Sequence, residues 1–317
     1  MTPVLEPKTQ AFINAVVAQG GKPLYQLSYP DARKVLEGAQ SGVIAKLPAD
    51  VEDLTLPAGP GGQVSVTIYR PQRVTGPLPA VMYFHGGGWV LGSKNTHDRL
   101  MRDLVNGTQA AFVFVNYTPS PEAQFPVPIE QAYAATKYIS ENAGQFDLNS
   151  NHLAVAGDSV GGNMATAVTL LAKERGGPTI RHQTLFYPVT GADFTTGSYT
   201  QFAAGPWLTK PAMEWFWDAY APNKSDRTKI TASPILATPA ELKGLPPALV
   251  VTDENDVLRD EGEQYARNLM EAGVNVTAVR FIGTFHDFVM LNGLAGTPAS
   301  LNAIRLASNQ ITAALSK

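Results

Sequence analysis

The sequence predicts an α/β fold, in which a mostly parallel sheet of eight strands is flanked by helices on both faces. Three observations support this prediction. Short apolar segments alternate with segments of helical periodicity along most of the 317 residues. A Gly-x-Ser-x-Gly pattern stands between one such strand and the helix after it. A His-Gly-Gly-Gly run directly follows another strand. Strands that alternate with helices in this way imply parallel neighbours.

The elements follow one another in a regular order, and clusters of Pro and Gly separate several of them. The expected strands are residues 51–56, 64–69, 80–84, 111–116, 153–156, 184–186, 248–252 and 275–281. The expected helices are residues 9–18, 98–106, 129–141, 164–172, 209–220, 260–271 and 298–315.

Two segments do not fit the alternation, and we expect them to form a helical cap. Residues 1–50 are too apolar for a free tail. Residues from about 190 to 230 contain no strand pattern but hold three of the four Trp residues. The expected organisation is a main domain at residues 51–317, with the cap formed by residues 1–50 and by an insertion at about 190–230.

Composition excludes several classes of function. The formal net charge is −3 and no basic block occurs, so a nucleic-acid partner is not expected. The chain contains no Cys, which excludes disulfides, thiolate catalysis and zinc–thiolate sites. Residues 1–10 lack an apolar signal core, and no run of about 18 apolar residues occurs. We therefore expect a soluble protein without membrane contact, in the cytoplasm.

The Gly-x-Ser-x-Gly pattern is Gly157-Asp158-Ser159-Val160-Gly161. Between a strand and a helix it is typical of a sharp turn that exposes a nucleophilic serine, with glycines where side chains would collide. A glycine-rich phosphate-binding turn is the alternative, because chance alone yields the pattern roughly 0.1 times in such a chain. The run His85-Gly86-Gly87-Gly88 is expected by chance only about 0.003 times, and the two together favour a serine hydrolase.

A serine nucleophile needs a base and an acid that orients the base. His286 follows the last strand and Asp256 follows the strand before it, so Ser159, Asp256 and His286 stand in the chain order of such a triad. Asp253, Glu254 and Asp260 crowd the same loop as Asp256, and most of these acids are expected to be solvated or capping groups.

The other histidines do not form a rival site. His97, His152 and His182 lack metal-ligand spacing and are expected at the surface, so no metal is predicted. His85 is expected to hydrogen-bond and shape the glycine loop beside it.

Four motifs together resemble the hormone-sensitive-lipase-like group of α/β-hydrolases, the bacterial family IV esterases. The resemblance spans nearly the whole chain after residue 60. The motifs are His85-Gly86-Gly87-Gly88-Trp89, Gly157-Asp158-Ser159-Val160-Gly161-Gly162-Asn163, Asp256-Val257-Leu258-Arg259-Asp260-Glu261-Gly262 and Gly283-Thr284-Phe285-His286-Asp287-Phe288.

The resemblance implies an α/β-hydrolase fold and a carboxylic ester hydrolase for short to medium acyl chains. Such an enzyme acts without a cofactor and forms an acyl-enzyme on Ser159. By the resemblance, His286 is the base and Asp256 orients the imidazole of His286. Backbone N–H groups are expected to form the oxyanion hole, and five side chains are expected to contact a small-molecule ester. The oxyanion donors are Gly86, Gly87 and Val160, and the substrate contacts are Trp89, Tyr187, Asp158, Asp287 and Trp207.

Three residues depart from the family pattern: Thr118 stands in place of Arg, Val257 in place of Pro, and Asp287 in place of Gly. In an extended loop, adjacent side chains point apart, so Asp287 should not reach the inner nitrogen of His286 but should act on it through space.

A non-catalytic binding protein on the same fold and a serine amidase or peptidase are the alternative functions. The oligomeric state stays open between monomer and homodimer.

Overall fold

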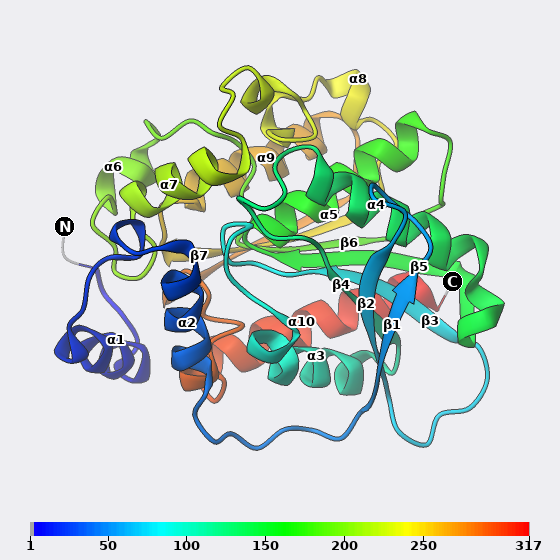
Figure 1. The fold of residues 1–317 in the computed structure, drawn as a ribbon, viewed down its shortest axis with the longest axis horizontal. Helices are drawn as coiled ribbons and strands as arrows, with labels where there is room; N and C mark the ends of the chain where they lie inside the picture. Colours follow the sequence, from blue (N-terminus) through cyan, green and yellow to red (C-terminus); the bar gives the residue numbers. More distant parts are fainter. Residues whose placement is uncertain (1–2, 317) are drawn as a thin grey trace.

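The computed structural model describes residues 3–316, which form one eight-stranded sheet between two layers of helices (Figure 1). The order of strands in the sheet is β1-β2-β4-β3-β5-β6-β7-β8. β2 is antiparallel to both of its neighbours, and all other pairs are parallel. The predicted fold class is thereby confirmed. The strands are β1 Asp50–Leu56, β2 Val64–Arg70, β3 Leu78–Phe84, β4 Ala111–Asn116, β5 Leu148–Asp158, β6 Gln183–Phe186, β7 Ala248–Asn255 and β8 Val276–Phe285.

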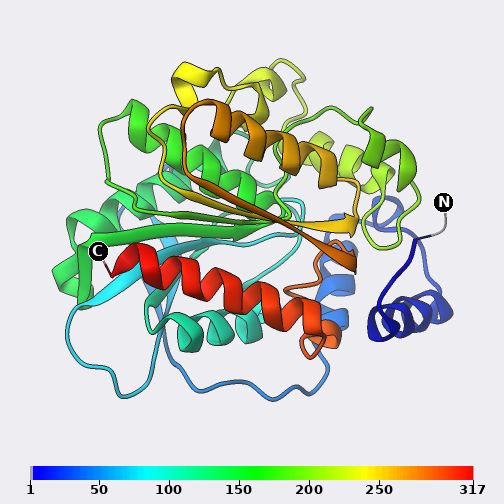
Figure 2. The same cartoon turned by 180° about the vertical axis from the view of Figure 1, so that it is seen from behind.

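Five long helices cover the sheet; four of them connect strands, and α10 follows the last strand. α3 and α10 lie on one face, and α4, α5 and α9 lie on the other (Figures 1 and 2). Because both faces are covered, the central strands are buried along almost their whole length, as in β3 and β4. These helices are α3 Lys94–Thr108, α4 Val127–Glu141, α5 Val160–Glu174, α9 Arg259–Glu271 and α10 Pro298–Leu315.

The two segments outside the alternation lie beyond the carboxyl ends of the parallel strands (Figure 2). The N-terminal segment meets the insertion where Tyr29 stacks on Trp215, with ring centroids 4.9 Å apart. The N-terminal elements are α1 Pro7–Gln19, η1 Leu24–Gln26 and α2 Tyr29–Gln40, and those of the insertion are α6 Gly197–Gln201, α7 Lys210–Tyr220 and η3 Asp226–Thr228.

Every expected strand and helix is present, although β5 extends beyond its expected range of 153–156 at both ends; α2 and the short helices were not predicted. α2 follows a Gly- and Pro-rich stretch, but Ser28 caps it by accepting a hydrogen bond from the Asp31 N–H, and Pro30 occupies its first turn. The remaining short helices are η2 Ala143–Phe146, η4 Pro234–Leu236, α8 Pro239–Leu242 and η5 Asn292–Leu294. Within residues 3–316, none of the helices combines the length and apolarity needed to cross a membrane.

Candidate active site

Ser159 lies in the sharp turn between β5 and α5, with φ 55° and ψ −122°. Its N–H donates to the carbonyl oxygen of Phe186 at 2.9 Å, which ties the turn to the end of β6. A Cβ on Gly161 would overlap the carbonyl oxygen of Phe84, and a Cβ on Gly157 would overlap that of Gly161. The two glycines are therefore required by the close approach of the turn to β3, and the turn holds a serine in a strained conformation.

Two hydrogen bonds join the three residues predicted to form a triad. Ser159 Oγ lies 2.9 Å from Nε2 of His286, and Nδ1 of His286 lies 2.7 Å from Oδ2 of Asp256. The other oxygen of Asp256 accepts from the N–H of Leu258 at 3.1 Å. All three side chains are buried. Nδ1–H donates inward to a carboxylate, so Nε2 is free to accept a proton from the serine.

The structure separates the four acids that were expected in one loop: Asp253 and Glu254 lie in β7, Asp256 follows it, and Asp260 lies in the first turn of α9. Only Asp256 bonds to His286 among them, within the described residues. Glu254 accepts from the N–H of Gly283, and Asp260 accepts from the N–H of Ser198. Asp253 is fully buried and neither of its oxygens accepts a hydrogen bond within the described residues, so it is neither a solvated nor a capping carboxylate.

Asp287 lies on the opposite side of the imidazole from Asp256. Its Oδ1 is 3.5 Å from Nε2 of His286, and its Oδ2 accepts from Nε1 of Trp207 at 2.9 Å. As expected, it does not reach the inner nitrogen. The expected extended loop was wrong, because Asp287 has φ 71° and the chain turns there.

Charge and burial act in opposite directions on His286. Burial lowers the pKa of its imidazole, but the nearby carboxyls of Asp256 and Asp287 outweigh burial and raise the pKa to about 10. An imidazole with this pKa would hold its proton at neutral pH. Burial also raises the pKa values of Asp253 and Asp287. A proton on either carboxyl removes a negative charge and so reduces the rise in the pKa of His286.

The glycine loop after β3 requires a correction to the expected oxyanion donors. The N–H of Gly86 donates to Oδ1 of Asp158 at 3.1 Å, so it is not available to a substrate. Gly87 and Gly88 line the cavity beside Ser159, and their N–H groups have no acceptor among residues 3–316. Free donors next to the nucleophile are thus offered by Gly87, Gly88 and Val160, the first residue of α5.

Asp158 holds the glycine loop against the serine turn. Its carboxylate accepts from the Tyr83 hydroxyl at 2.7 Å and lies 3.2 Å from Nε2 of His97, besides the bond to Gly86. Burial alone would raise the pKa of Asp158, but these partners lower it, so the group is an anion that faces inward. This placement differs from the expected contact with substrate.

The histidines expected at the surface require a second correction. His97 and His182 are buried, and only His152 is partly exposed. His97 bonds to Asp158, a contact that spacing along the chain does not reveal. His85 lies against the glycine loop as expected: its Nδ1 is 2.8 Å from the carbonyl oxygen of Gly86, and burial lowers its pKa to about 3.

A cavity of about 710 Å³ opens above the serine. Its base carries Ser159, His286 and Asp287, and its walls come from the N-terminal segment and from the insertion. The wall residues are mainly apolar and include Ile13, Val16, Leu36, Trp207, Leu208, Met213 and Phe216. The indole of Trp207 also stacks on Phe285, with centroids 6.1 Å apart.

Trp89 and Tyr187 lie behind the cavity wall, not on it. Trp89 stacks on Tyr220, the last residue of α7, with ring centroids 3.9 Å apart. Tyr187 packs edge-on against the ring of His286 at 4.8 Å. Both are almost completely buried, so they support the site from behind, where direct contact with substrate was expected.

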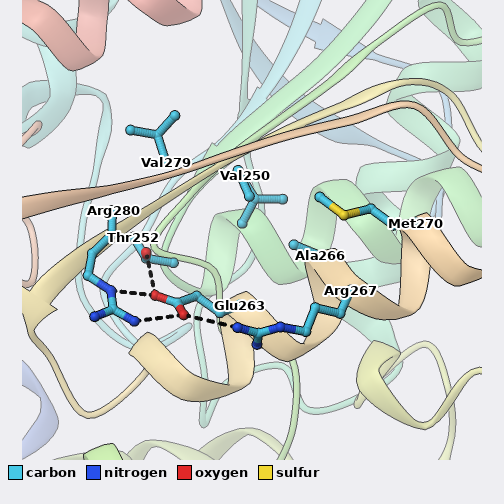
Figure 3. Close-up of a pocket in the computed structure, with 9 residues that line it drawn as sticks. Val250, Thr252, Glu263, Ala266, Arg267, Met270, Val279 and Arg280 are labelled. Atoms are coloured by element: carbon cyan, nitrogen blue, oxygen red, sulfur yellow. Dashed lines mark hydrogen bonds and ion pairs between the residues drawn. The ribbon is translucent and has the colours of Figure 1, made fainter.

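A second hollow of about 400 Å³ lies between α9 and the edge strand β8 (Figure 3). Its charged side chains are paired with one another: Glu263 bonds to Arg280 at 2.6 and 2.8 Å and pairs with Arg267 at 3.7 Å. Its nine lining residues include neither a serine nor a histidine. The chemistry therefore belongs to the cavity above Ser159.

The fold, the serine turn and the three hydrogen-bonded side chains together define a serine hydrolase of the α/β-hydrolase class. Comparisons with known proteins lead to the same class. A family model described as alpha/beta hydrolase fold matches residues 81–290. The chain is 41% identical to a putative alpha/beta hydrolase, R526, of Acanthamoeba polyphaga mimivirus, over 97% of this chain and 87% of the relative. It is 40% identical to the carboxylesterase NlhH of Mycobacterium tuberculosis, over 71% of each chain.

Among solved structures, a thermostable esterase from Pseudomonas putida ECU1011 superimposes with a TM-score of 0.97 and 51% identity, over 99% of each chain. The protein belongs to the hormone-sensitive-lipase-like family of α/β-hydrolases, as the sequence predicted. The prediction that it is an enzyme, a carboxylesterase, is also confirmed.

Proposed function

We propose that this carboxylesterase hydrolyses esters of short to medium acyl chains through an acyl-enzyme on Ser159, with His286 as base and Asp256 as the orienting acid. The observation that carries the proposal is the continuous pair of hydrogen bonds, Ser159 to His286 and His286 to Asp256, at the base of the cavity.

In the first half-reaction, Oγ of Ser159 bonds to the ester carbonyl carbon while its proton passes to Nε2 of His286. The negative charge that develops on the carbonyl oxygen faces the N–H groups of Gly87, Gly88 and Val160. When the tetrahedral intermediate collapses, the bond to the alcohol oxygen breaks and His286 returns the proton to that oxygen. The acyl group is left as an ester of Ser159.

In the second half-reaction, a water molecule gives one proton to His286, and its oxygen bonds to the same carbonyl carbon. Collapse breaks the bond to Oγ, and His286 returns the proton to Ser159. The carboxylic acid is released and the enzyme is restored. Asp256 stays ionised throughout, because its role is to orient the imidazole and to stabilise its positive charge.

The cavity supports the preference for short acyl chains. Residues from α1, α2 and the insertion line it, and apolar side chains such as Leu36 and Phe216 offer contacts to a short acyl chain. Asp287 places a carboxyl beside the reacting centre, which disfavours substrates that carry a carboxylate there.

A series of p-nitrophenyl esters from acetyl to dodecanoyl tests the proposal. We expect kcat/KM to be highest between acetyl and hexanoyl, to fall for longer chains, and to vanish with Ser159→Ala. Equal or better kcat/KM on dodecanoyl esters would show an open pocket. Matched amide and ester substrates test the alternative activity, since the same triad serves both acyl transfers; faster cleavage of the amide would make the protein an amidase.

A further inference from the structure

Asp253 is a buried acid beside the triad that the mechanism above does not use. It is the last residue of β7 to pair with β8, opposite Phe281, before the register shifts. Its side chain is completely buried. The titratable groups that face it are Asp256, His286 and Asp287 from the neighbouring loops, together with Tyr187 at the end of β6.

The hydrogen bonding of Asp253 differs from that of Asp256. Within residues 3–316, neither carboxyl oxygen of Asp253 accepts a hydrogen bond. Asp256 accepts from Nδ1 of His286 and from the N–H of Leu258. A buried carboxylate without donors is strongly disfavoured, whereas a protonated carboxyl needs only one acceptor for its O–H.

Asp256 lies beside Asp253 and is an acceptor for such an O–H. One carboxyl oxygen of Asp253, one of Asp256 and a ring nitrogen of His286 all lie within 4.8 Å of one another. Two buried carboxyls at this separation do not both ionise, so one of them keeps a proton. Since the donors point at Asp256, the proton belongs on Asp253. Burial, and next the charge of Asp256, raise the pKa of Asp253 well above its usual range.

We propose that Asp253 is a neutral carboxylic acid that donates a hydrogen bond to the carboxylate of Asp256 and so holds it in line with Nδ1 of His286. Each oxygen of Asp256 has one donor already and a second lone pair for Asp253. Asp253 touches neither the serine nor the substrate, so it is a positioning residue. The proposal rests on the proposed function, in which Asp256 orients the base.

The neutral state of Asp253 also affects the base. An ionised Asp253 would add a second negative charge on the inner side of His286 and raise the pKa of the imidazole further. The base would then stay protonated over a wider pH range. A neutral Asp253 fixes Asp256 in place without adding charge.

Two variants of matched shape separate hydrogen bonding from charge. Asp253→Asn and Asp253→Leu are both neutral and similarly branched, but only Asn donates a hydrogen bond. We expect Asp253→Asn to keep kcat within about threefold and to leave the acidic limb of the kcat/KM profile in place. We expect Asp253→Leu to lose about tenfold or more in kcat at nearly constant KM, because the orientation of His286 is lost.

Infrared spectroscopy gives a readout that does not depend on activity. In difference spectra against either variant, the unmodified enzyme should show the carbonyl stretch of a buried protonated carboxyl, shifted in heavy water. Circular dichroism and thermal unfolding establish whether each variant is folded. If Asp253→Leu does not fold, the infrared band and the pH profile of Asp253→Asn decide the matter.

Several results would overturn the proposal. A shift of the acidic limb to lower pH in Asp253→Asn would show that Asp253 is ionised in the native enzyme. Equal kcat for Asn and Leu would show that its hydrogen bond has no role. Loss of activity with a chelator and recovery with Zn²⁺ would assign a cation to the three ligand atoms. Failure of the proposed function is distinct, since Ser159→Ala would then remain active while the infrared band is unaffected.

Discussion

The cavity has a floor made of strand ends and a roof made of the cap, and the two are held together differently. The floor consists of the triad and the glycine loop, which are fixed by directional hydrogen bonds of 2.7–3.1 Å. The roof consists of α1, α2 and residues 203–216, whose contacts with the cavity are mainly apolar. The bond between Asp287 and Trp207 links floor to roof.

This difference predicts different kinetic effects. Hydrogen bonds set distances and angles, and the reaction depends on those of the floor, so changes there should lower kcat. Apolar packing sets shape and tolerates adjustment, so changes in the roof should alter KM and selectivity. The predictions below test this division, beginning with the largest expected effect.

Removal of the nucleophile or the base is the most severe test of the floor. We expect Ser159→Ala and His286→Ala each to lose about a million-fold in kcat, and the double variant to be no worse, because the triad acts as a unit. Steady-state kinetics on a short-chain ester measures all three. A His286→Ala enzyme with a tenth of the native kcat would exclude His286 as the base.

The orienting acid is the next test. Asp256→Asn should lose about 10⁴ in kcat, because the imidazole is then held in the wrong tautomer. Glu254→Gln is the matched control from the end of β7, since Glu254 accepts from the N–H of Gly283 and does not bond to His286. A small loss of kcat in Asp256→Asn, together with a loss of nearly all activity in Asp287→Ala, would show that Asp287 is the orienting acid.

Asp287 tests the boundary between floor and roof. Asp287→Ala should keep kcat within about tenfold, because the bond between His286 and Asp256 is untouched. The carboxyl of Asp287 contributes to the raised pKa of His286, so its removal lowers that pKa. The free base then exists at lower pH, and the acidic limb of kcat/KM moves to lower pH. Asp287→Asn should move the limb equally; an unmoved limb in both would show that Asp287 carries no charge there.

The smallest effect is expected in the roof. Trp207→Phe removes the N–H donor to Asp287 but keeps a ring that can stack on Phe285. We expect KM to rise about two- to fivefold with kcat nearly constant, since one partly exposed hydrogen bond is lost. Trp215→Phe, in a residue that stacks on Tyr29 and does not line the cavity, is the control. A larger effect on kcat than on KM would show that Trp207 takes part in the geometry of the floor.

Much of the fold, and the meeting of Ser159, His286 and Asp256, was open to prediction from the sequence, because the signals are local. Long helices and buried strands show their periodicity within a short window, and the serine turn needs glycines at fixed spacing. The short α2 was missed because its start signal, Ser28 before Pro30, follows a stretch that resembles a loop.

The sequence by itself determined the set of chemical groups. These are a serine in a strained turn, a histidine after the last strand, and several acids close together in the chain. Only the tertiary structure decided which group meets which. It selected Asp256 among four acids, assigned the N–H of Gly86 to Asp158, and buried Asp253 without a donor. The physical reason is that a partner, a burial state and a side-chain direction depend on elements far apart in the chain. His97 and Asp158, which are 61 residues apart in the sequence, meet only in the folded protein, where α3 packs on β2 and β4 and where β5 pairs with β3.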